Sequence, residues 1–242
     1  MNKLFKLEFS LDEKLPEKDQ EEVIDWFIQE VKARLKSGRN FICIIHGPTG
    51  SGKSYLAMKI AEVLDPTFNV NRVLFNPENF FKLVKTLPPD SFVVVDEAGA
   101  ILDARRFMTA INCITSYVLE TFRFKRVNVI FTVPSIKMLD INVRRLMHCM
   151  VFQEDRGKAR IYKIMMSFDG ATWPKRIGTF VGVSMPSQTL CDAYEEKKHR
   201  EFDSVLEKAI GSFGVEETVE QHPNVPIVQT ENVESVFSIL ES

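Results

Sequence analysis

The segment FICIIHGPTGSGKS, residues Phe41 to Ser54, decides the fold class of this chain. Its first six residues are almost all apolar, as in a buried strand of a parallel sheet. The remaining eight follow the pattern Gly-x-x-x-x-Gly-Lys-Ser, which forms a phosphate-binding loop between a strand and a helix. The sequence after the loop predicts such a helix from about Lys53 to Val63. The four fixed positions would occur together by chance in a chain of this size only about once in a hundred.

The predicted loop supplies the groups that hold a triphosphate. Glycines let backbone N–H groups turn inwards around the β-phosphate, where a Cβ atom would collide. The positive end of the following helix dipole also faces the anion. We expect the Lys53 ammonium to bridge the β- and γ-phosphates and the Ser54 hydroxyl to bind Mg²⁺. The predicted nucleotide-binding residues are therefore Gly47, Pro48, Thr49, Gly50, Ser51, Gly52, Lys53 and Ser54.

Strands alternate with helices on both sides of the loop. An apolar stripe with helical spacing predicts a helix from Lys18 to Ser37, and Gly38 follows it as a stop. Alternation of strands and helices is typical of a mainly parallel α/β sheet with right-handed crossovers. The elements expected after the loop are strands at Val70–Phe75, Phe92–Val95 and Val127–Val133, a short helix that opens at Asn76-Pro77 and closes at Pro88-Pro89, and a long helix at Phe107–Phe122.

The strand at Phe92–Val95 runs into a second motif, FVVVDEAG (Phe92–Gly99), which has more than one functional interpretation. A GTPase would use it as the Asp-x-x-Gly of a switch loop, with Asp96 and Gly99 sensing the γ-phosphate. An ATPase would place Asp96 on the metal and Glu97 on the attacking water. A structural interpretation is a pair of acids that caps a helix after any strand.

Three observations favour the ATPase. No Asn-Lys-x-Asp tetrapeptide, which a GTPase needs to hold guanine, occurs in the chain. A complete predicted strand separates the phosphate loop from Asp96, and another buried strand follows it. In the division of ATPases that has such additional strands, the later strand lies between the other two. The hydroxyl of Thr132, near the end of that strand, would then lie beside the γ-phosphate as a polar sensor.

After Pro134 the pattern changes. Two apolar runs flank Asp155-Arg156-Gly157, which predicts a β-hairpin, and Arg176–Val183 can add one more strand. A helix is expected from about Ser187, with Gly211 as its end. We therefore expect four regions: an N-terminal strand and helix extension at 1–40, a phosphate-loop domain with the hairpin at 41–186, the C-terminal helix at 187–211 and an acidic tail at 212–242.

Composition is that of an ordinary globular protein of the cytoplasm. Of the 242 residues, 45% are apolar and 26% are charged, and no run of 18 apolar residues occurs. Four widely separated cysteines fit neither a zinc site nor a disulfide framework, which favours a reducing compartment. Six acids and no Lys or Arg follow Lys208, so removing these acids from the net charge of −2 leaves +4 for the rest of the chain. That mild positive charge is compatible with a nucleic-acid partner.

Three motifs resemble those of the FtsK–HerA superfamily of RecA-like P-loop ATPases. They are GPTGSGKS, VVVDEAG and FRFKRVNVIFTVPSIKMLDINVRRL, within a stretch from about Phe41 to Val151. The resemblance is to small members encoded by archaeal viruses and mobile elements, and to the ATPase part of zonular-occludens-toxin-like phage proteins. It implies ATP and Mg²⁺ as cofactors. It also implies a ring-shaped, often hexameric assembly that pumps DNA or separates its strands.

The resemblance further implies an arginine finger and a polar Thr-Gln pair. Arg123 occupies the finger position, with Arg126 as the alternative, and both also fit a solvated helix end. Thr132 matches the Thr of the pair, whereas Val133 replaces the Gln. A finger from a neighbouring subunit would stabilise charge on the γ-phosphoryl group and would make hydrolysis depend on assembly.

Other basic residues have two interpretations each. Arg144 and Arg145 could contact phosphates across a subunit boundary or pair with surface acids. Arg105 and Arg106 are candidates for an interface or a DNA-facing loop. Three cations on the second hairpin strand would share one face, on which a DNA backbone could lie, although lysines also protect sheet edges from aggregation. These three are Lys158, Arg160 and Lys163.

Residues and resemblance together predict a cytoplasmic, Mg²⁺-dependent ATPase that acts on DNA as a homo-oligomeric ring. DNA packaging, transfer or partitioning for a virus or plasmid would each fit. One alternative is an assembly ATPase of the phage-extrusion or loader type, whose partner is a protein bound through the acidic tail. Another is a nucleotide-binding switch that hydrolyses slowly because Val133 replaces the Gln.

Overall fold

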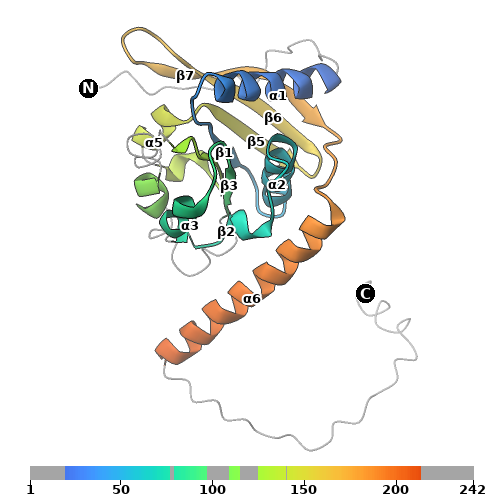
Figure 1. Cartoon of the computed structure of the whole chain (residues 1–242), viewed down its shortest axis with the longest axis vertical. Helices are drawn as coiled ribbons and strands as arrows, with labels where there is room; N and C mark the ends of the chain where they lie inside the picture. The colour runs from blue at the N-terminus through green and yellow to red at the C-terminus, as the bar shows by residue number, and fades with distance from the viewer. Residues whose placement is uncertain (1–19, 77–78, 97–108, 115–124, 140, 214–242) are drawn as a thin grey trace, which may run out of the picture. The chain divides into compact units, whose positions relative to one another are not determined.

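The structure is a computed structural model that describes residues 20–76, 79–96, 109–114, 125–139 and 141–213 (Figure 1). The chain divides into two compact units, Met1–Leu206 and Glu207–Ser242. Of the second unit only residues 207–213 are described, and they are helical. The sheet and the candidate site belong to the first unit.

A seven-stranded sheet forms the centre of the first unit. Its strands are β1 (Ile42–His46), β2 (Val73–Leu74), β3 (Phe92–Val95), β4 (Asn128–Val133), β5 (Cys149–Asp155), β6 (Lys158–Met166) and β7 (Thr172–Val181). They are arranged in the order β2-β3-β4-β1-β5-β6-β7. The first five in that order are parallel, and β6 and β7 extend the sheet in antiparallel pairing. β4 lies between β1 and β3, so the predicted fold class is confirmed.

Helices cover both faces of the parallel part of the sheet. They are α1 (Gln20–Lys36), α2 (Lys53–Leu64), α3 (Phe80–Thr86), α5 (Ile141–Leu146) and α6 (Gln188–Phe213), and residues 109–114 are also helical. Side chains alternate along β1: Cys43 and Ile45 pack on the face of α1 and α2, whereas Ile42 and Ile44 pack on the face of α3 and α5. Figure 1 shows α2 on the opposite side of the sheet from α3 and α5.

The prediction of a strand at Val70–Phe75 is wrong for the first half of that segment. Val70–Arg72 form a 3₁₀ turn, η1, and β2 contains only the two residues that follow it. The side chain of Asn69 accepts a hydrogen bond from the Asn71 N–H at 3.0 Å, which favours a turn over an extended chain. A local side-chain contact thus overrides the apolar pattern.

Other boundaries also differ from the prediction. α6 continues to Phe213, past Gly211, because a glycine inside a helix weakens it by only about 1 kcal/mol and does not by itself end it. β7 begins at Thr172, ahead of the predicted Arg176, because its early residues already pair with β6. Of the long helix expected at Phe107–Phe122, residues 109–114 are described and are helical.

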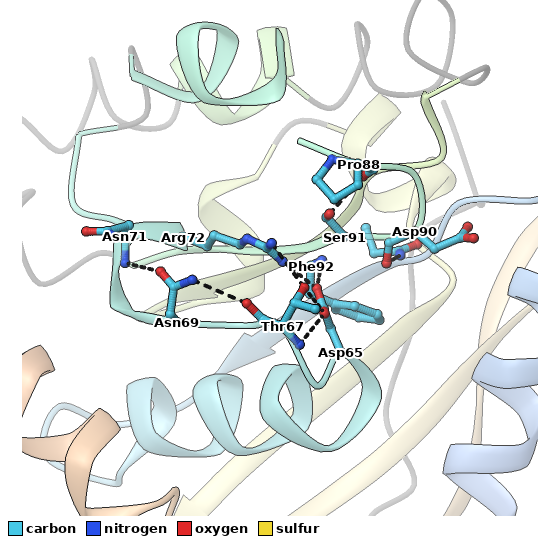
Figure 2. Close-up of polar contacts among 10 residues, drawn as sticks. Asp65, Thr67, Asn69, Asn71, Arg72, Pro88, Asp90, Ser91 and Phe92 are labelled. Atoms are coloured by element: carbon cyan, nitrogen blue, oxygen red, sulfur yellow. Dashed lines mark hydrogen bonds and ion pairs between the residues drawn. The ribbon is translucent and has the colours of Figure 1, made fainter. Parts of the chain in front are cut away.

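Figure 2 shows a network of polar contacts where α2 ends and β3 begins. The carboxylate of Asp65 accepts hydrogen bonds from Arg72 Nη1 at 2.6 Å and from the Phe92 N–H at 3.0 Å. Both of these donors bind Oδ2, whereas Oδ1 accepts from the N–H and the hydroxyl of Thr67, at 2.9 and 2.7 Å. Burial by itself raises the pKa of Asp65, but these hydrogen bonds and the charge of Arg72 outweigh it and lower that pKa. The network fixes α2 and η1 to the amino end of β3.

A second set of contacts ties the amino ends of β1 and β5 together. His148 Nδ1 accepts a hydrogen bond from the Ile42 N–H at 2.9 Å, and Arg34 Nη2 lies 2.5 Å from His148 Nε2. Burial, and then the charges of Arg34 and Arg39, lower the pKa of His148 to about 3. The imidazole is therefore neutral at neutral pH, as its role of hydrogen-bond acceptor requires.

Candidate active site

The phosphate loop joins the end of β1 to the start of α2. Gly52 precedes α2 with φ 92°, a left-handed conformation that favours glycine. Gly47 packs against β5, where a Cβ atom on it would lie 2.1 Å from the carbonyl oxygen of Gln153. Lys53 Nζ donates to the carbonyl oxygens of Gly47 and Pro48 at 2.9 and 2.8 Å. These contacts place a positive charge inside the loop.

Asp96 follows the last residue of β3 and lies beside the first turn of α2. Its Oδ1 accepts hydrogen bonds from the Ser54 hydroxyl at 2.9 Å and from the Thr132 hydroxyl at 2.5 Å. Its Oδ2 accepts from the Tyr194 hydroxyl at 2.7 Å. Asp96 and Thr132 are each only 1% exposed. The carboxyl ends of β3 and β4 and the start of α2 therefore bring three of the predicted site residues together.

The oxygen atoms of Ser54 and Asp96 suit a small, hard cation. Among the residues that the structure describes, no group of three or more His, Cys, Asp or Glu side chains could hold a metal by itself. Mg²⁺ does not need such a cage, because it takes most of its ligands from water and nucleotide phosphates and only one or two from the protein. The residues present thus fit Mg²⁺ better than a metal such as Zn²⁺, which takes most of its ligands from protein side chains.

A pocket of about 750 Å³ opens over the loop. This volume lies within the range of small-molecule binding sites. Its walls come from the phosphate loop, the turn between β5 and β6, the segment between β7 and α6, and the first turns of α6. The lining residues used below are Lys53, Ser54, Tyr55, Asp96, Thr132, Arg156, Tyr194 and Glu195.

Arg156 lines this pocket, although the sequence indicates only a hairpin turn at its position. Its Nε donates to the Gly50 carbonyl oxygen at 3.4 Å, so the guanidinium lies at the rim of the phosphate loop. The signal that could have found it is topological. Because β5 is parallel to β1, the turn after β5 must emerge at the same edge of the sheet as the loop after β1.

Two tyrosines also belong to the site and were missed from the sequence. The Tyr55 hydroxyl donates to Glu195 Oε1 at 2.5 Å, and its ring packs edge-on against that of Tyr194. Burial, and then the hydrogen bond to Glu195, raise the pKa of Tyr55 to about 12. Burial, and then the charge of Asp96, raise the pKa of Tyr194, so both hydroxyls remain protonated at neutral pH.

His46 ends β1 directly before the loop. Its ring packs against Phe152, with the ring centres 5.1 Å apart. Burial, and then the positive charge of Lys53, lower its pKa to about 4. The imidazole is therefore neutral at neutral pH and adds no positive charge beside the phosphates.

Some predicted site residues lie outside the described part of the chain. These are Glu97 and Arg123, together with Arg105 and Arg106. Val133, which replaces the Gln that the resemblance implies, is fully buried in the core on the face of α3 and α5. It therefore points away from Asp96, and Thr132 is the polar residue that the end of β4 supplies to the site.

The alternative finger residues lie away from the loop of their own chain. Arg126 precedes the amino end of β4, opposite the loop edge, and its Nη2 pairs with Asp90 Oδ2 at 2.8 Å. Arg144 and Arg145 lie in the last turn of α5. None of these three arginines lines the pocket over the loop.

Comparisons with known proteins gave matches of two kinds. The profile of the ResIII family, described as type III restriction enzyme, res subunit, matches residues 13–77. No curated protein sequence matches the chain. The sheet order, the phosphate loop with its buried carboxylate, and the ResIII match point to one class. This chain is an ATP-hydrolysing P-loop enzyme.

Several solved structures are similar to this chain at low sequence identity. The N-terminal domain of zonular occludens toxin from Neisseria meningitidis is 14% identical with a TM-score of 0.35, over 62% of this chain and 97% of that one. The RuvB Holliday junction branch migration motor of Thermotoga maritima is 18% identical with a TM-score of 0.37, over 56% and 45%. ATPases 2 and 3 of EssC from Geobacillus thermodenitrificans are 12% identical with a TM-score of 0.39, over 70% and 45%. The chain thus spans less than half of the RuvB and EssC chains.

The cations of the hairpin do not form the single basic face that the sequence analysis expects. Lys158 and Arg160 both pair with Glu154 on the neighbouring strand. Lys163 is separated from Lys158 and from Arg160 by an odd number of positions along β6, so its side chain lies on the opposite face of the strand. There it pairs with Glu30 of α1 at 2.5 Å. The expectation of one shared face is wrong.

Two further findings on this P-loop enzyme concern membrane-spanning helices and cysteines. In the described segments, no helix has the length and the apolar character needed to cross a membrane. All four cysteines lie in those segments as free thiols, and three of them are buried.

Proposed function

We propose that the protein hydrolyses ATP with Mg²⁺ at this site and uses the energy to move DNA, as a homo-oligomer that is a hexameric ring. The observation that carries the chemistry is the position of Asp96. Its carboxylate lies at the end of a central strand, within hydrogen-bond distance of the phosphate-loop Ser54 and of Thr132. This arrangement supports a metal-dependent phosphoryl transfer to water.

Each residue has a proposed part in the reaction. The loop amides and Lys53 bind the β- and γ-phosphates, and Ser54 and Asp96 hold Mg²⁺. Bound Mg²⁺ neutralises charge that develops on the phosphate oxygens. Glu97 orients the attacking water and accepts its proton, and Thr132, whose hydroxyl donates to Asp96, is the polar sensor beside the γ-phosphate. A Glu97→Gln variant that still turned over ATP at the wild-type rate would remove Glu97 from this scheme.

DNA as the substrate is supported by the resemblance of three motifs to the FtsK–HerA superfamily and by the net charge of +4 that remains outside the tail. The pairing of Lys158 and Arg160 with Glu154 shifts the expected DNA contacts elsewhere. Arg105 and Arg106, which follow the Asp-Glu motif, are the proposed contacts. Because such contacts go to the phosphate backbone, binding should be independent of sequence and sensitive to salt.

The test is the rate of ATP hydrolysis with and without double-stranded DNA, at low and at high salt. Strong stimulation by DNA that salt removes is the expected result. Lys53→Ala serves as the inactive control, and Arg105→Gln combined with Arg106→Gln should lose stimulation while keeping the basal rate. Hydrolysis that is indifferent to DNA at low salt would overturn the motor function while leaving the ATPase in place.

The arginine finger has a separate test, because it depends on a neighbouring subunit. Mixing Arg123→Ala with Lys53→Ala subunits should restore part of the activity if each site takes its arginine from the next chain. Mixed rings without any recovered activity would argue against Arg123 acting across the subunit boundary.

A protein partner is the second candidate, and an observation on α6 favours it. Phe202 and Leu206 are 47% and 48% exposed on the part of α6 that lies beyond the site. Exposed apolar side chains on one helix are suited to pack against another protein. Indifference to DNA, combined with an affinity for a partner that Phe202→Ser abolishes, would favour this function.

A further inference from the structure

The first turns of α6 are attached directly to the elements that build the nucleotide site. The Ser187 N–H, just before α6, donates to the Glu62 carboxylate of α2 at 3.1 Å. Glu195 accepts from Tyr55, which follows Ser54 in α2. Lys197 Nζ donates to the carbonyl oxygens of Val70 and Val73, at 3.1 and 2.6 Å. These contacts hold the helix in a defined position over the loop.

Tyr194 is the residue of α6 that reaches the reaction centre. It is 1% exposed, and its ring packs between Tyr55 and Phe75, with centroids 5.7 and 5.6 Å away. A phenylalanine could fill the same space. The hydroxyl group therefore has a specific role, which is its hydrogen bond to Asp96 Oδ2.

The hydrogen bonds to Asp96 are divided between its two oxygens. Ser54 and Thr132 donate to Oδ1, whereas Tyr194 donates to Oδ2. Rotation about the Cβ–Cγ bond moves both oxygens, so donors on both of them restrain the plane of the carboxylate more firmly than donors on Oδ1 alone. A fixed plane keeps the carboxylate in the orientation that a metal ligand requires, as outer hydrogen-bond partners do in metal sites.

We infer that Tyr194 is a positioning residue, which orients Asp96 for Mg²⁺ and so links the seating of α6 to the binding of the Mg²⁺–nucleotide complex. The inference rests on the proposed function, because it takes Asp96 as the residue on the metal side. By thermodynamic linkage, a helix that stabilises the metal-binding arrangement must itself be stabilised when the metal complex binds.

The experiment compares ADP binding to the full-length protein with Mg²⁺ and with EDTA, by titration calorimetry. Wild type should bind ADP more tightly with Mg²⁺. Tyr194→Phe keeps the ring and removes only the hydroxyl. The ratio of its ADP affinities with Mg²⁺ and with EDTA should therefore be about tenfold smaller than in wild type, which corresponds to one hydrogen bond to a charged group. Its affinity in EDTA should match that of wild type, which also shows that the variant is folded.

Tyr162→Phe is the matched control, because Tyr162 lies on β6 and packs on the opposite face of the sheet from Tyr194. It should keep the Mg²⁺-dependent gain. A second readout is hydrogen exchange in the segment 188–198, which Mg²⁺–ADP should slow in wild type and in Tyr162→Phe but not in Tyr194→Phe.

Several outcomes would overturn the inference. A Tyr194→Phe variant with an unchanged or a larger Mg²⁺ gain would show that the hydroxyl does not orient Asp96 for the metal. An equal loss of affinity with Mg²⁺ and with EDTA would assign Tyr194 a general packing role. A wild-type protein without any Mg²⁺ gain would overturn the proposed metal site and this inference with it, which distinguishes the two failures.

Discussion

Two buried aspartates lie at opposite ends of β3, and they are stabilised in different ways. At the amino end, Asp65 pairs with Arg72 at 2.6 Å and accepts the first N–H of the strand. At the carboxyl end, Asp96 accepts hydrogen bonds from the hydroxyls of Ser54, Thr132 and Tyr194. Asp65 is 8% exposed and Asp96 is 1% exposed.

The difference separates a structural carboxylate from a functional one. A buried negative charge is costly unless a cation or several hydrogen bonds compensate for it. Arg72 supplies a full positive charge to Asp65 permanently, so that end of the strand has no charge left to offer a ligand. The three hydroxyls on Asp96 are neutral, and they orient the carboxylate without cancelling its charge. That charge remains available to a metal ion.

The largest expected effect follows from Asp96→Asn. The amide oxygen can still accept from Ser54 and Thr132, and the amide N–H₂ can donate to the Tyr194 oxygen, but the side chain carries no charge to hold Mg²⁺. The rate of ATP hydrolysis should therefore fall about 100-fold or more. The free energy of unfolding should change by less than about 1 kcal/mol, because no cation loses its partner. Steady-state phosphate release and urea denaturation check the two halves of this prediction.

The reverse result is expected for Asp65→Asn. Arg72 is left buried without its anion, which should lower the free energy of unfolding by about 3 kcal/mol or more. Hydrolysis per folded molecule should stay near the wild-type value. Adding Arg72→Met should restore part of the stability, since it removes the unpaired charge. If Asp65→Asn instead left the denaturation midpoint unchanged, Asp65 would not have the structural role that distinguishes it from Asp96.

His148 sharpens the comparison, because it also lies at the amino edge and titrates. Its pKa is lowered from 6.5 to about 3 in the folded protein, so between these values the unfolded chain binds a proton that the folded protein does not. Stability should therefore be fully present above pH 6.5 and fall as the pH drops towards 3. His148→Asn offers an oxygen to the Ile42 N–H but does not titrate there. The free energy of unfolding of this variant, measured by urea denaturation, should therefore fall less between about pH 7 and pH 5 than that of wild type.

The smallest expected effect concerns the loop edge. Arg156 is exposed and lies 3.4 Å from the Gly50 carbonyl oxygen, so its charge acts on phosphates through a largely solvated path. Arg156→Gln should weaken ATP binding by about three- to tenfold, with little change in stability. Arg200→Gln, which removes an exposed arginine on α6, is the control and should bind ATP as wild type does. Equal effects of the two substitutions would mean that Arg156 contributes only to overall charge.

The sequence predicts one end of the sheet far better than the other. The Gly-rich loop and the Asp-Glu motif are local patterns, and parallel strands bring their carboxyl ends to one edge, so Ser54, Asp96 and Thr132 could be placed together in advance. The pairing of Asp65 with Arg72 depends on a 3₁₀ turn that the Asn69 side chain induces, and an apolar pattern does not reveal it. Tyr194 could be placed on a helix, but only the packing of that helix over α2 shows which strand end its hydroxyl reaches.

Arg156 and Lys163 show a second reason for the failures. The role of Arg156 depends on which strand lies next to β1, and that neighbour comes from a distant part of the chain. The face of Lys163 follows from simple counting along β6, yet its partner, Glu30, belongs to a helix more than a hundred residues earlier. Long-range pairing of this kind leaves no local pattern in the sequence.

The contact of Gly47 with β5 has a consequence for how the loop motif tolerates change. The carbonyl oxygen of Gln153 closes off the space beside the Gly47 Cα, whether or not a nucleotide is bound. An alanine at this position would separate two neighbouring strands before it met any phosphate. The first glycine of the motif is thus required by the architecture of the sheet, and a protein that lost all catalytic activity would still be obliged to retain it.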